Sequence, residues 1–308
     1  MKKILLVISI TGFMFAEGKI GGVTYFDFIS TDDSSAFNFQ RQYFGYSGDI
    51  SDKVSYKILF DVGRTNKNDG EDTRLVTYLK KAQVNYKSSS GKVNFGLIGM
   101  NTYAVQESNW GYRFIEKSTI DKNGFSSTAD LGVGFSKSII DNLNLSFQIV
   151  NGEGFKKPQG DKYHKIAFNA TYGESNLIKN DGYNAGLVYT TEQTDTDPIT
   201  MTSIFGGFAG MGIRIGGEYD MKTIGGVNSN IVSVSTNYTV RDNIDVFVRY
   251  DIYDGDTSID NNGKDYLVAG IVLTCDGGIS VAPNVRTTTY EDETEALTEY
   301  KVNFQFKF

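Results

Sequence analysis

The run NIDVFVRYDIY at residues 243–253 carries an apolar side chain at every even position. Asp245, Arg249 and Asp251 stand at odd positions between them. Successive side chains of a β-strand point to opposite faces, so this spacing predicts a strand with one apolar and one charged face. The charged face has to meet water, and the apolar face has to meet another apolar surface or lipid.

The same spacing recurs in KVSYKILFDV (53–62), NLNLSFQIVNG (142–152) and the final run EYKVNFQFKF (299–308). We therefore predict an all-β chain of sixteen strands, with no amphipathic helix between them and a turn near Ala209 and Gly210. The predicted spans are 20–30, 37–48, 52–64, 75–87, 91–103, 126–136, 141–151, 163–173, 181–191, 200–208, 210–221, 229–240, 243–254, 264–274, 277–290 and 297–308.

The connectors between these strands alternate between two classes. Every second one is short, such as KSSSG (87–91) and VRDN (240–243). Those between are mostly longer and polar, such as GEGFKKPQGD (152–161) and DGDTSIDNNGK (254–264). Short turns at one end and long loops at the other are typical of a transmembrane β-barrel. An even number of strands also puts both termini of the chain on the short-turn side of the barrel.

Composition excludes several classes of function. The net charge of −7 argues against nucleic acid as a partner. Cys275 is the only cysteine and His164 the only histidine, so neither a disulfide framework nor a cysteine-rich metal site can form. We expect no cofactor. A mean hydropathy of −0.28 does not fit a helical membrane protein.

The first residues are typical of an export signal. Lys2 and Lys3 precede the apolar run ILLVISITGFMFA at residues 4–16. This run is too short to cross a bilayer as a helix, which needs ~20 residues, and it matches a secretory signal peptide. We predict a signal peptide over residues 1–16 and a barrel domain over residues 17–308.

Alternation alone does not say which face lies inside, and a secreted soluble sandwich or propeller stays open as an alternative. In a bilayer every backbone polar group must be satisfied, so a spanning sheet has to close on itself. The final alternating run ends on Phe308 and resembles the C-terminal signal of outer-membrane barrels. We therefore expect the bacterial outer membrane, with its lipid and lipopolysaccharide as partners.

A barrel of sixteen strands leaves an aqueous channel rather than a filled core. Its inward positions should therefore be polar, and alternation assigns both signs of charge to them in nearly equal numbers. The predicted inward bases are Arg41, Lys57, Lys81, Lys165, Arg214, Arg249 and Arg286. The predicted inward acids are Asp27, Asp61, Asp130, Glu218, Asp220, Asp245 and Asp251.

One connector, AVQESNWGYRFIEKSTIDKNGF at residues 104–125, is unlike the others. It is the longest, it is the third on the long-loop side, and it holds Trp110, the only tryptophan. Long loops in compact domains are usually functional or disordered, and this one has too many aromatic residues for disorder. We expect it to fold into the channel as a constriction; an ordinary surface loop is the alternative. The predicted constriction residues are Glu107, Trp110, Arg113, Glu116 and Lys117.

Five short motifs, which together span most of the exported chain, resemble the phosphate-selective O and P type porin family. They are RQYFGYSGDISDKVSYKILFDV (41–62), ESNWGYRFIEKS (107–118), TADLGVGFS (128–136), VNGEGF (150–155) and GGEYD (216–220). The resemblance implies a sixteen-stranded barrel, usually trimeric, that passes small solutes. Phosphate-selective members carry a basic eyelet, to which Arg41 and Arg113 could belong. The third loop here has three bases against three acids. We therefore take the resemblance to imply a channel but not selectivity for phosphate.

The predicted function is an outer-membrane porin, a water-filled channel for passive diffusion of small polar solutes and ions. With Arg113 and Lys117 opposite Glu107 and Glu116, the constriction should admit both signs of charge and favour polar or zwitterionic solutes. Two alternatives stay open. The barrel could be a lipase-like outer-membrane enzyme built around His164, or a structural barrel that does not conduct.

Overall fold

The computed structural model describes residues 18–64, 74–292 and 294–308. The predicted signal peptide, residues 1–16, lies outside the described residues. Sixteen strands form, as the alternation predicts. They are β1 Lys19–Ser30, β2 Ser35–Asp49, β3 Val54–Arg64, β4 Leu75–Ser88, β5 Gly91–Gly99, β6 Ala129–Ile140, β7 Leu143–Val150, β8 Lys165–Gly173, β9 Gly182–Glu192, β10 Ile199–Gly210, β11 Ile213–Ile224, β12 Val227–Arg241, β13 Ile244–Asp254, β14 Lys264–Cys275, β15 Ile279–Tyr290 and β16 Leu297–Lys307.

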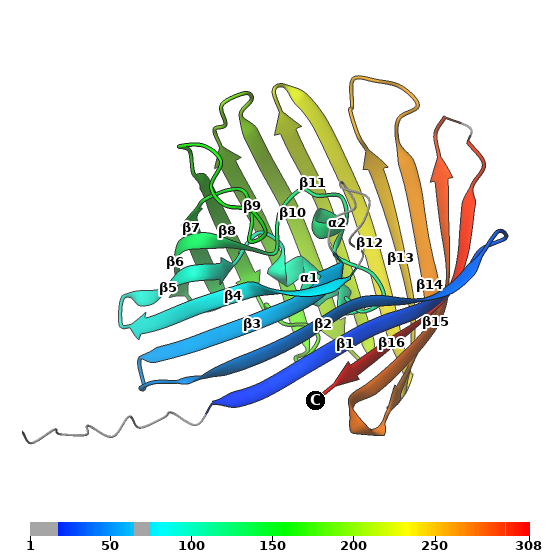
Figure 1. Cartoon of the computed structure of the whole chain (residues 1–308), viewed down its shortest axis with the longest axis horizontal. Helices are drawn as coiled ribbons and strands as arrows, with labels where there is room; N and C mark the ends of the chain where they lie inside the picture. The colour runs from blue at the N-terminus through cyan, green and yellow to red at the C-terminus, as the bar shows by residue number, and fades with distance from the viewer. Residues whose placement is uncertain (1–17, 65–73, 293) are drawn as a thin grey trace, which may run out of the picture.

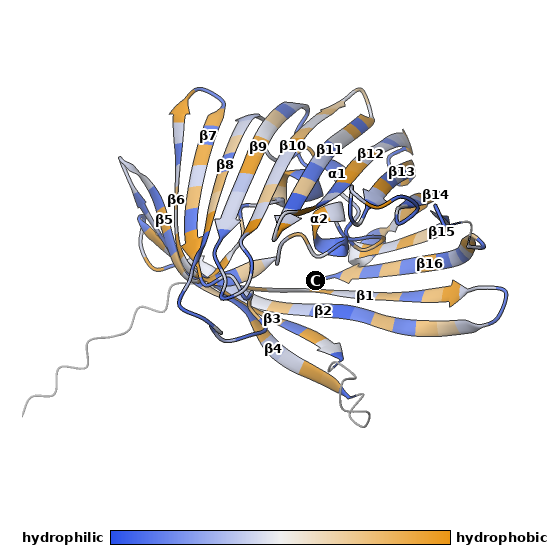
Figure 2. Cartoon of the chain, turned by 90° about the horizontal axis from the view of Figure 1, so that it is seen from above, coloured by the Kyte–Doolittle hydropathy of each residue, from blue (hydrophilic) through white to orange (hydrophobic). Residues whose placement is uncertain are grey.

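The strands close into a single antiparallel barrel. Each strand pairs with its neighbours in the chain, and β1 pairs with β16. That closing ladder runs from Val23 opposite Lys307 to Ser30 opposite Tyr300, so the two edges of the sheet meet. Figure 1 shows the strands as a tilted ring, and Figure 2 shows the same ring from above. The prediction of a sixteen-stranded barrel is confirmed.

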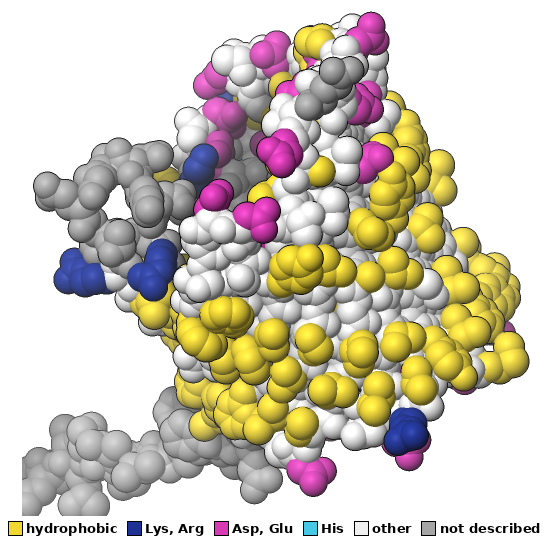
Figure 3. Space-filling view, turned by 90° about the vertical axis from the view of Figure 1, so that its right-hand side faces the viewer, with side chains coloured by type: hydrophobic (Ala, Val, Ile, Leu, Met, Phe, Trp, Pro, Cys, Tyr) yellow, Lys and Arg dark blue, Asp and Glu magenta, His cyan; other side chains and the backbone are white. Residues whose placement is uncertain are grey.

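The apolar face of each strand is outside and the polar face is inside. In β13, Val246 and Val248 are exposed, whereas Arg249 and Asp251 are only 2% and 3% exposed. Figure 3 shows hydrophobic side chains gathered in a broad band around the outer wall, with acidic side chains above it. A polar interior inside an apolar outer band requires lipid around the barrel, so the soluble sandwich does not fit.

Two short helices interrupt the connector between β5 and β6, which corrects the prediction that no helix would be found. α1 spans Ala104–Trp110 and α2 spans Thr119–Lys122, and a 3-10 turn, η2, spans Asp276–Gly278. α1 ends at Gly111, whose φ of 81° allows its amide to bond back to the carbonyl of Glu107. None of the helices in the described part of the chain is long and apolar enough to cross a membrane.

The connectors follow the predicted alternation with three exceptions. The loops at 31–34 and 225–226 are short although they lie on the long-loop side, and the connector at 174–181 is long although it lies on the short-turn side. The turn predicted at Ala209 and Gly210 instead lies two residues later, at Met211 and Gly212. These two residues have φ values of 56° and 75°, which fit a tight hairpin turn, and Gly210 still pairs with Ile213.

Phe308 takes part in closing the barrel. Its backbone exchanges two hydrogen bonds with Gly22, at 3.0 and 3.1 Å. A Cβ on Gly22 would come within 2.3 Å of the Phe308 ring, so only glycine leaves room for the ring here. Further along the same seam Phe26 stacks on Phe304 with 4.7 Å between ring centroids.

Candidate functional site

The connector between β5 and β6 packs against the buried faces of distant strands. The Trp110 ring lies edge-on to Phe247 of β13, with 5.8 Å between ring centroids. The Tyr112 ring is tilted to the same Phe247, with 5.5 Å between centroids. Phe114 and Ile115 join the same cluster, which extends to side chains of β14 and β15. Both views draw α1 and α2 within the ring of strands (Figures 1 and 2).

Two glycines and a pair of asparagines hold α1 against β9, β10 and β11. Asn109 and Asn184 exchange two amide hydrogen bonds of 2.9 Å each. A Cβ on Gly207 would lie 2.6 Å from the Asn109 amide, and one on Gly216 would lie 3.0 Å from the Asn109 Cβ. The helix can approach these strands this closely only because both positions lack a side chain.

The Arg113 guanidinium is held by two carboxylates of its own connector. It lies 3.4 Å from Glu107 and 2.9 Å from Asp121. These charges raise the pKa of Arg113 further above its ordinary value, although burial acts in the opposite direction and is the largest single effect. Arg113 therefore stays charged and fixed in position, with Glu107 as a direct partner rather than an opposing charge across the channel.

Glu116 ties the connector to the wall of the barrel. It accepts hydrogen bonds from Arg286 at 3.1 Å and from the Tyr266 hydroxyl at 2.8 Å, and it lies 3.6 Å from Lys122. The Lys117 carbonyl accepts a 2.6 Å hydrogen bond from Arg249. The Lys117 side chain itself is exposed.

Arg41 and the neighbouring Lys80 share one buried acid. They lie 3.5 and 3.6 Å from Asp61, and both donate to the Tyr43 hydroxyl, at 2.6 and 2.8 Å. Alternation assigned Lys81 inward and missed Lys80. A β-bulge causes the miss: Leu59 pairs with Lys81 but Phe60 pairs with Leu79, so Lys80 is an extra residue that also turns inward.

The remaining predicted inward residues are spread over the wall rather than gathered at one place. Arg214 donates to the Trp110 carbonyl at 3.3 Å, and Lys165 lies 2.8 Å from Glu192. Glu218 accepts from Thr119 of α2 at 2.7 Å. Lys57 is exposed near the beginning of β3. Five of the predicted acids are buried: Asp27, Asp61, Asp130, Asp220 and Asp251.

Three cavities lie in series along the connector between β5 and β6, and the inner one is lined partly by Ala104 and Glu107 of α1. An outer cavity of about 200 Å³ shares Glu116, Arg286 and Lys301 with a middle cavity of about 310 Å³. The middle cavity shares Tyr25 and Arg113 with an inner cavity of about 360 Å³. Shared linings mean that the three spaces adjoin, with Tyr25 and Arg113 between the two larger ones.

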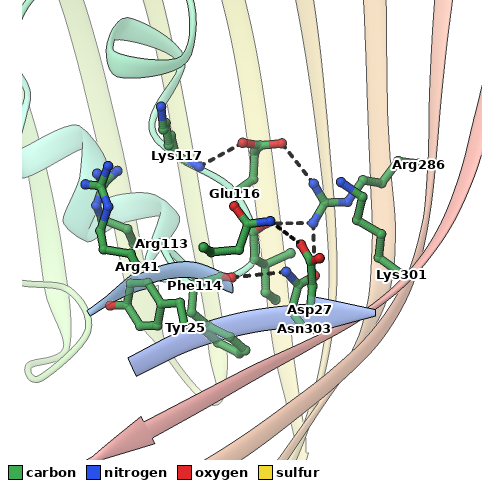
Figure 4. Close-up of a pocket in the computed structure, with 12 residues that line it drawn as sticks. Tyr25, Asp27, Arg41, Arg113, Phe114, Glu116, Lys117, Arg286, Lys301 and Asn303 are labelled. Atoms are coloured by element: carbon green, nitrogen blue, oxygen red, sulfur yellow. Dashed lines mark hydrogen bonds and ion pairs between the residues drawn. The ribbon is translucent and has the colours of Figure 1, made fainter. Parts of the chain in front are cut away.

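Bases outnumber acids along this series. The outer cavity has four bases and three acids, the middle cavity five bases and two acids, and the inner cavity four bases and one acid. Figure 4 shows the middle cavity, with Arg41 and Arg113 together on one side and Arg286 and Lys301 on the other. Among the described residues no group of three His, Cys, Asp or Glu side chains could hold a metal ion.

A closed sixteen-stranded barrel with an apolar outer band and a charged interior defines an outer-membrane porin. The chain belongs to the family described as phosphate-selective porin O and P, whose model matches residues 21–263. Comparison with curated protein sequences finds no match.

Solved structures of other porins share the fold at low sequence identity. An OmpF of Salmonella typhi, solved with daunomycin, is 11% identical, with a TM-score of 0.69 over 95% of this chain and 98% of that one. An anion-selective porin of Comamonas acidovorans is 12% identical, with a TM-score of 0.67 over 95% and 100%. OmpT of Vibrio cholerae in its trimer form is 11% identical, with a TM-score of 0.68 over 94% and 99%.

Proposed function

We propose that this porin lets small polar solutes and ions diffuse passively across the outer membrane along the three adjoining cavities. The observation that carries the proposal is their continuity: each cavity shares lining residues with the next. Together they run from the loop end of β13 and β14, at Tyr253 and Lys264, to Ile178 and Lys307 at the short-turn end.

The narrowest part of this path is proposed to lie at Arg113. Tyr25 and Arg113 border both larger cavities, and Glu107 and Asp121 fix the guanidinium between them. The extensive packing of residues 103–125 against the strands favours a constriction over an ordinary surface loop. Trp110 serves as an anchor in this arrangement, because it is buried against Phe247 and does not line the middle or inner cavity.

The excess of bases favours anions over cations. A narrow path with low-dielectric walls concentrates the field of its charges on a passing ion. Purified protein in a planar bilayer with a potassium chloride gradient should give a reversal potential of the sign that reports chloride permeation. A cation-selective reversal potential would refute the anion preference, and absence of current would refute the channel.

We further propose a homotrimer in contact with lipid and lipopolysaccharide. The trimeric form of the structurally similar Vibrio cholerae OmpT supports the assembly, and the apolar outer band supports the contact with lipid. Native mass spectrometry of detergent-extracted protein should give three times the mass of one chain. N-terminal sequencing of the same material should begin at Glu17 if residues 1–16 are a cleaved signal peptide.

A non-enzymatic role fits the geometry better than a lipase-like one. His164 is exposed immediately before β8, and among the described residues it makes no hydrogen bond or ion pair with a serine or a carboxylate. A lipase would need a serine and a histidine within hydrogen-bond distance on the outer wall. Purified protein should therefore leave a phospholipid substrate intact.

A further inference from the structure

The inner cavity has an apolar side as well as a basic one. Its apolar lining includes Leu59, Met100 and Ile178, and its basic lining includes Lys81 and Lys307. Inward positions of a water-filled barrel are normally polar, because they face water. Leu59 therefore departs from the pattern, and Ile178 of the connector at 174–181, which is 53% exposed, adds a second apolar side chain to the lining.

The turn that presents Ile178 is held in place by hydrogen bonds from β9 and α1. It joins β8 to β9, and the Asn184 amide donates to the Glu174 carbonyl at 2.7 Å. Ser108 of α1 donates to Asn176 at 3.4 Å. The adjacent Leu177 is only 3% exposed. The turn thus buries one apolar side chain as an anchor and presents the next one to the cavity.

The basic side of the inner cavity holds two charges that no acid neutralises in the described structure. Arg113 and Lys80 are each paired with carboxylates, whereas Lys81 and Lys307 have no ion pair or hydrogen bond to any described side chain. A Cβ on Gly99 would lie 2.6 Å from the Lys81 ammonium, so this glycine makes room for it. Two available ammonium groups thus lie in the same cavity as three apolar side chains.

We propose that the inner cavity selects anions with an apolar body, such as aromatic or branched-chain carboxylates, over small anions without one. The carboxylate pairs with Lys81 or Lys307, and the body lies against Leu59, Met100 and Ile178. A volume of about 360 Å³ falls within the size range of small-molecule sites. The proposal rests on the function proposed above, since the solute must first enter the channel.

The test compares two carboxylates of equal charge as blockers of chloride current. Benzoate and acetate are added at the short-turn end of single channels in a planar bilayer. Benzoate should reduce the current at about tenfold lower concentration than acetate, because only benzoate removes apolar surface from water at Ile178 and Leu59. Ile178→Asn and Leu59→Asn, made separately, should each bring the two carboxylates to within about twofold of each other.

Matched variants separate this effect from general damage. Ile50→Asn changes an equally exposed isoleucine in another connector on the short-turn side, outside the cavity lining, and should keep the benzoate preference. Lys81→Gln should weaken block by both carboxylates alike. Ile178→Thr, which is close to isoleucine in shape, replaces Ile178→Asn if that variant does not assemble.

The outcomes distinguish this proposal from the one it rests on. Channels that conduct chloride but are blocked equally by benzoate and acetate would overturn the selection for an apolar body and leave the porin function intact. Protein that assembles but carries no current would overturn the porin function itself. Retention of the benzoate preference in both Ile178→Asn and Leu59→Asn would also overturn the proposal.

Discussion

Arg113 is the residue whose charge should matter most for permeation. It lies between the middle and inner cavities and is held by Glu107 and Asp121. Replacing Arg113 and Lys117 with glutamate leaves both partners unneutralised and changes the local charge by four. We expect the reversal potential in a salt gradient to move strongly toward cations, with a smaller change in conductance.

A matched pair of lysines provides the control for this reversal. Lys156 and Lys157 are exposed in the loop between β7 and β8 and line none of the three cavities. Lys156→Glu with Lys157→Glu makes the same change in charge at two residues that do not line the path. Equal shifts in the two double variants would mean that the field comes from the whole surface and not from Arg113.

Lys122 should make the channel sensitive to pH just above neutrality. Burial lowers the pKa of Lys122 to about 8, although Glu116 acts against the shift. Burial on its own raises the pKa of Glu116, but Lys122 and Arg286 outweigh it and the pKa falls to about 2. Between pH 7 and pH 9 the outer cavity therefore loses the positive charge of Lys122 and keeps the negative charge of Glu116.

Anion preference should accordingly fall as the pH rises from 7 to 9. Lys122→Met removes the titrating group, so this variant should begin with a lower anion preference and change less over the same range. Reversal potentials at several pH values measure both effects. An identical pH response in Lys122→Met and the unmodified protein would assign the titration to another group.

At the scale of single residues, parity along a strand predicted most of the inward charges. Arg249 and Asp251 were found because their strand has no irregularity between Ile244 and Tyr253. Lys80 was missed because a bulge turns two successive residues to the same side. The insertion does leave a mark in the sequence, because the outward apolar positions are odd up to Leu79 and even from Ala82 to Tyr86.

At the scale of secondary-structure elements, the position of α1 depends on its close contact with two glycines of β10 and β11. Gly207→Ala would place a Cβ 2.6 Å from the Asn109 amide, so the Asn109 side chain or the whole helix must shift away from β10. We expect destabilisation of about 1–3 kcal/mol and noisier single-channel currents, because overpacking is relieved by displacement. Gly217→Ala is the control, since its nearest neighbour would lie 3.8 Å away and it should behave as the unmodified protein.

The short helices could not be predicted from apolar periodicity. α1 has only seven residues, and its buried side chains are Val105, Gln106, Asn109 and Trp110. Two of these four are polar and form hydrogen bonds to distant strands, such as the one that Gln106 donates to Ser203 at 3.1 Å. The helix is therefore stabilised by tertiary contacts that a local pattern does not contain.

The closing seam should control how much barrel assembles. Phe308→Ala removes the ring that packs on Gly22, while Phe308→Tyr keeps a ring of similar size. We expect less heat-modifiable barrel on a gel for Phe308→Ala and nearly normal amounts for Phe308→Tyr. Equal yields from both variants would show that the backbone bonds to Gly22 suffice without the ring.

At the scale of the whole molecule, the sequence predicts the barrel but not the path of solutes through it. Alternation and the two classes of connector predicted sixteen strands, because a lipid-facing barrel needs both. Which side of the interior stays open depends on Gly207 and Gly216, which bring α1 against β10 and β11. That contact joins residues about a hundred positions apart, and no local pattern reports it.

The open route runs along the wall where the first and last strands of the barrel meet. Tyr25 and Arg41 on β1 and β2, and Arg286 and Asn303 on β15 and β16, all line the middle cavity. This wall exists only once β1 has paired with β16, so a half-assembled barrel has no lining with which to sort ions. Selectivity is thus acquired in the last step of assembly, and a fault at the seam would make the outer membrane leaky as well as lowering the amount of porin.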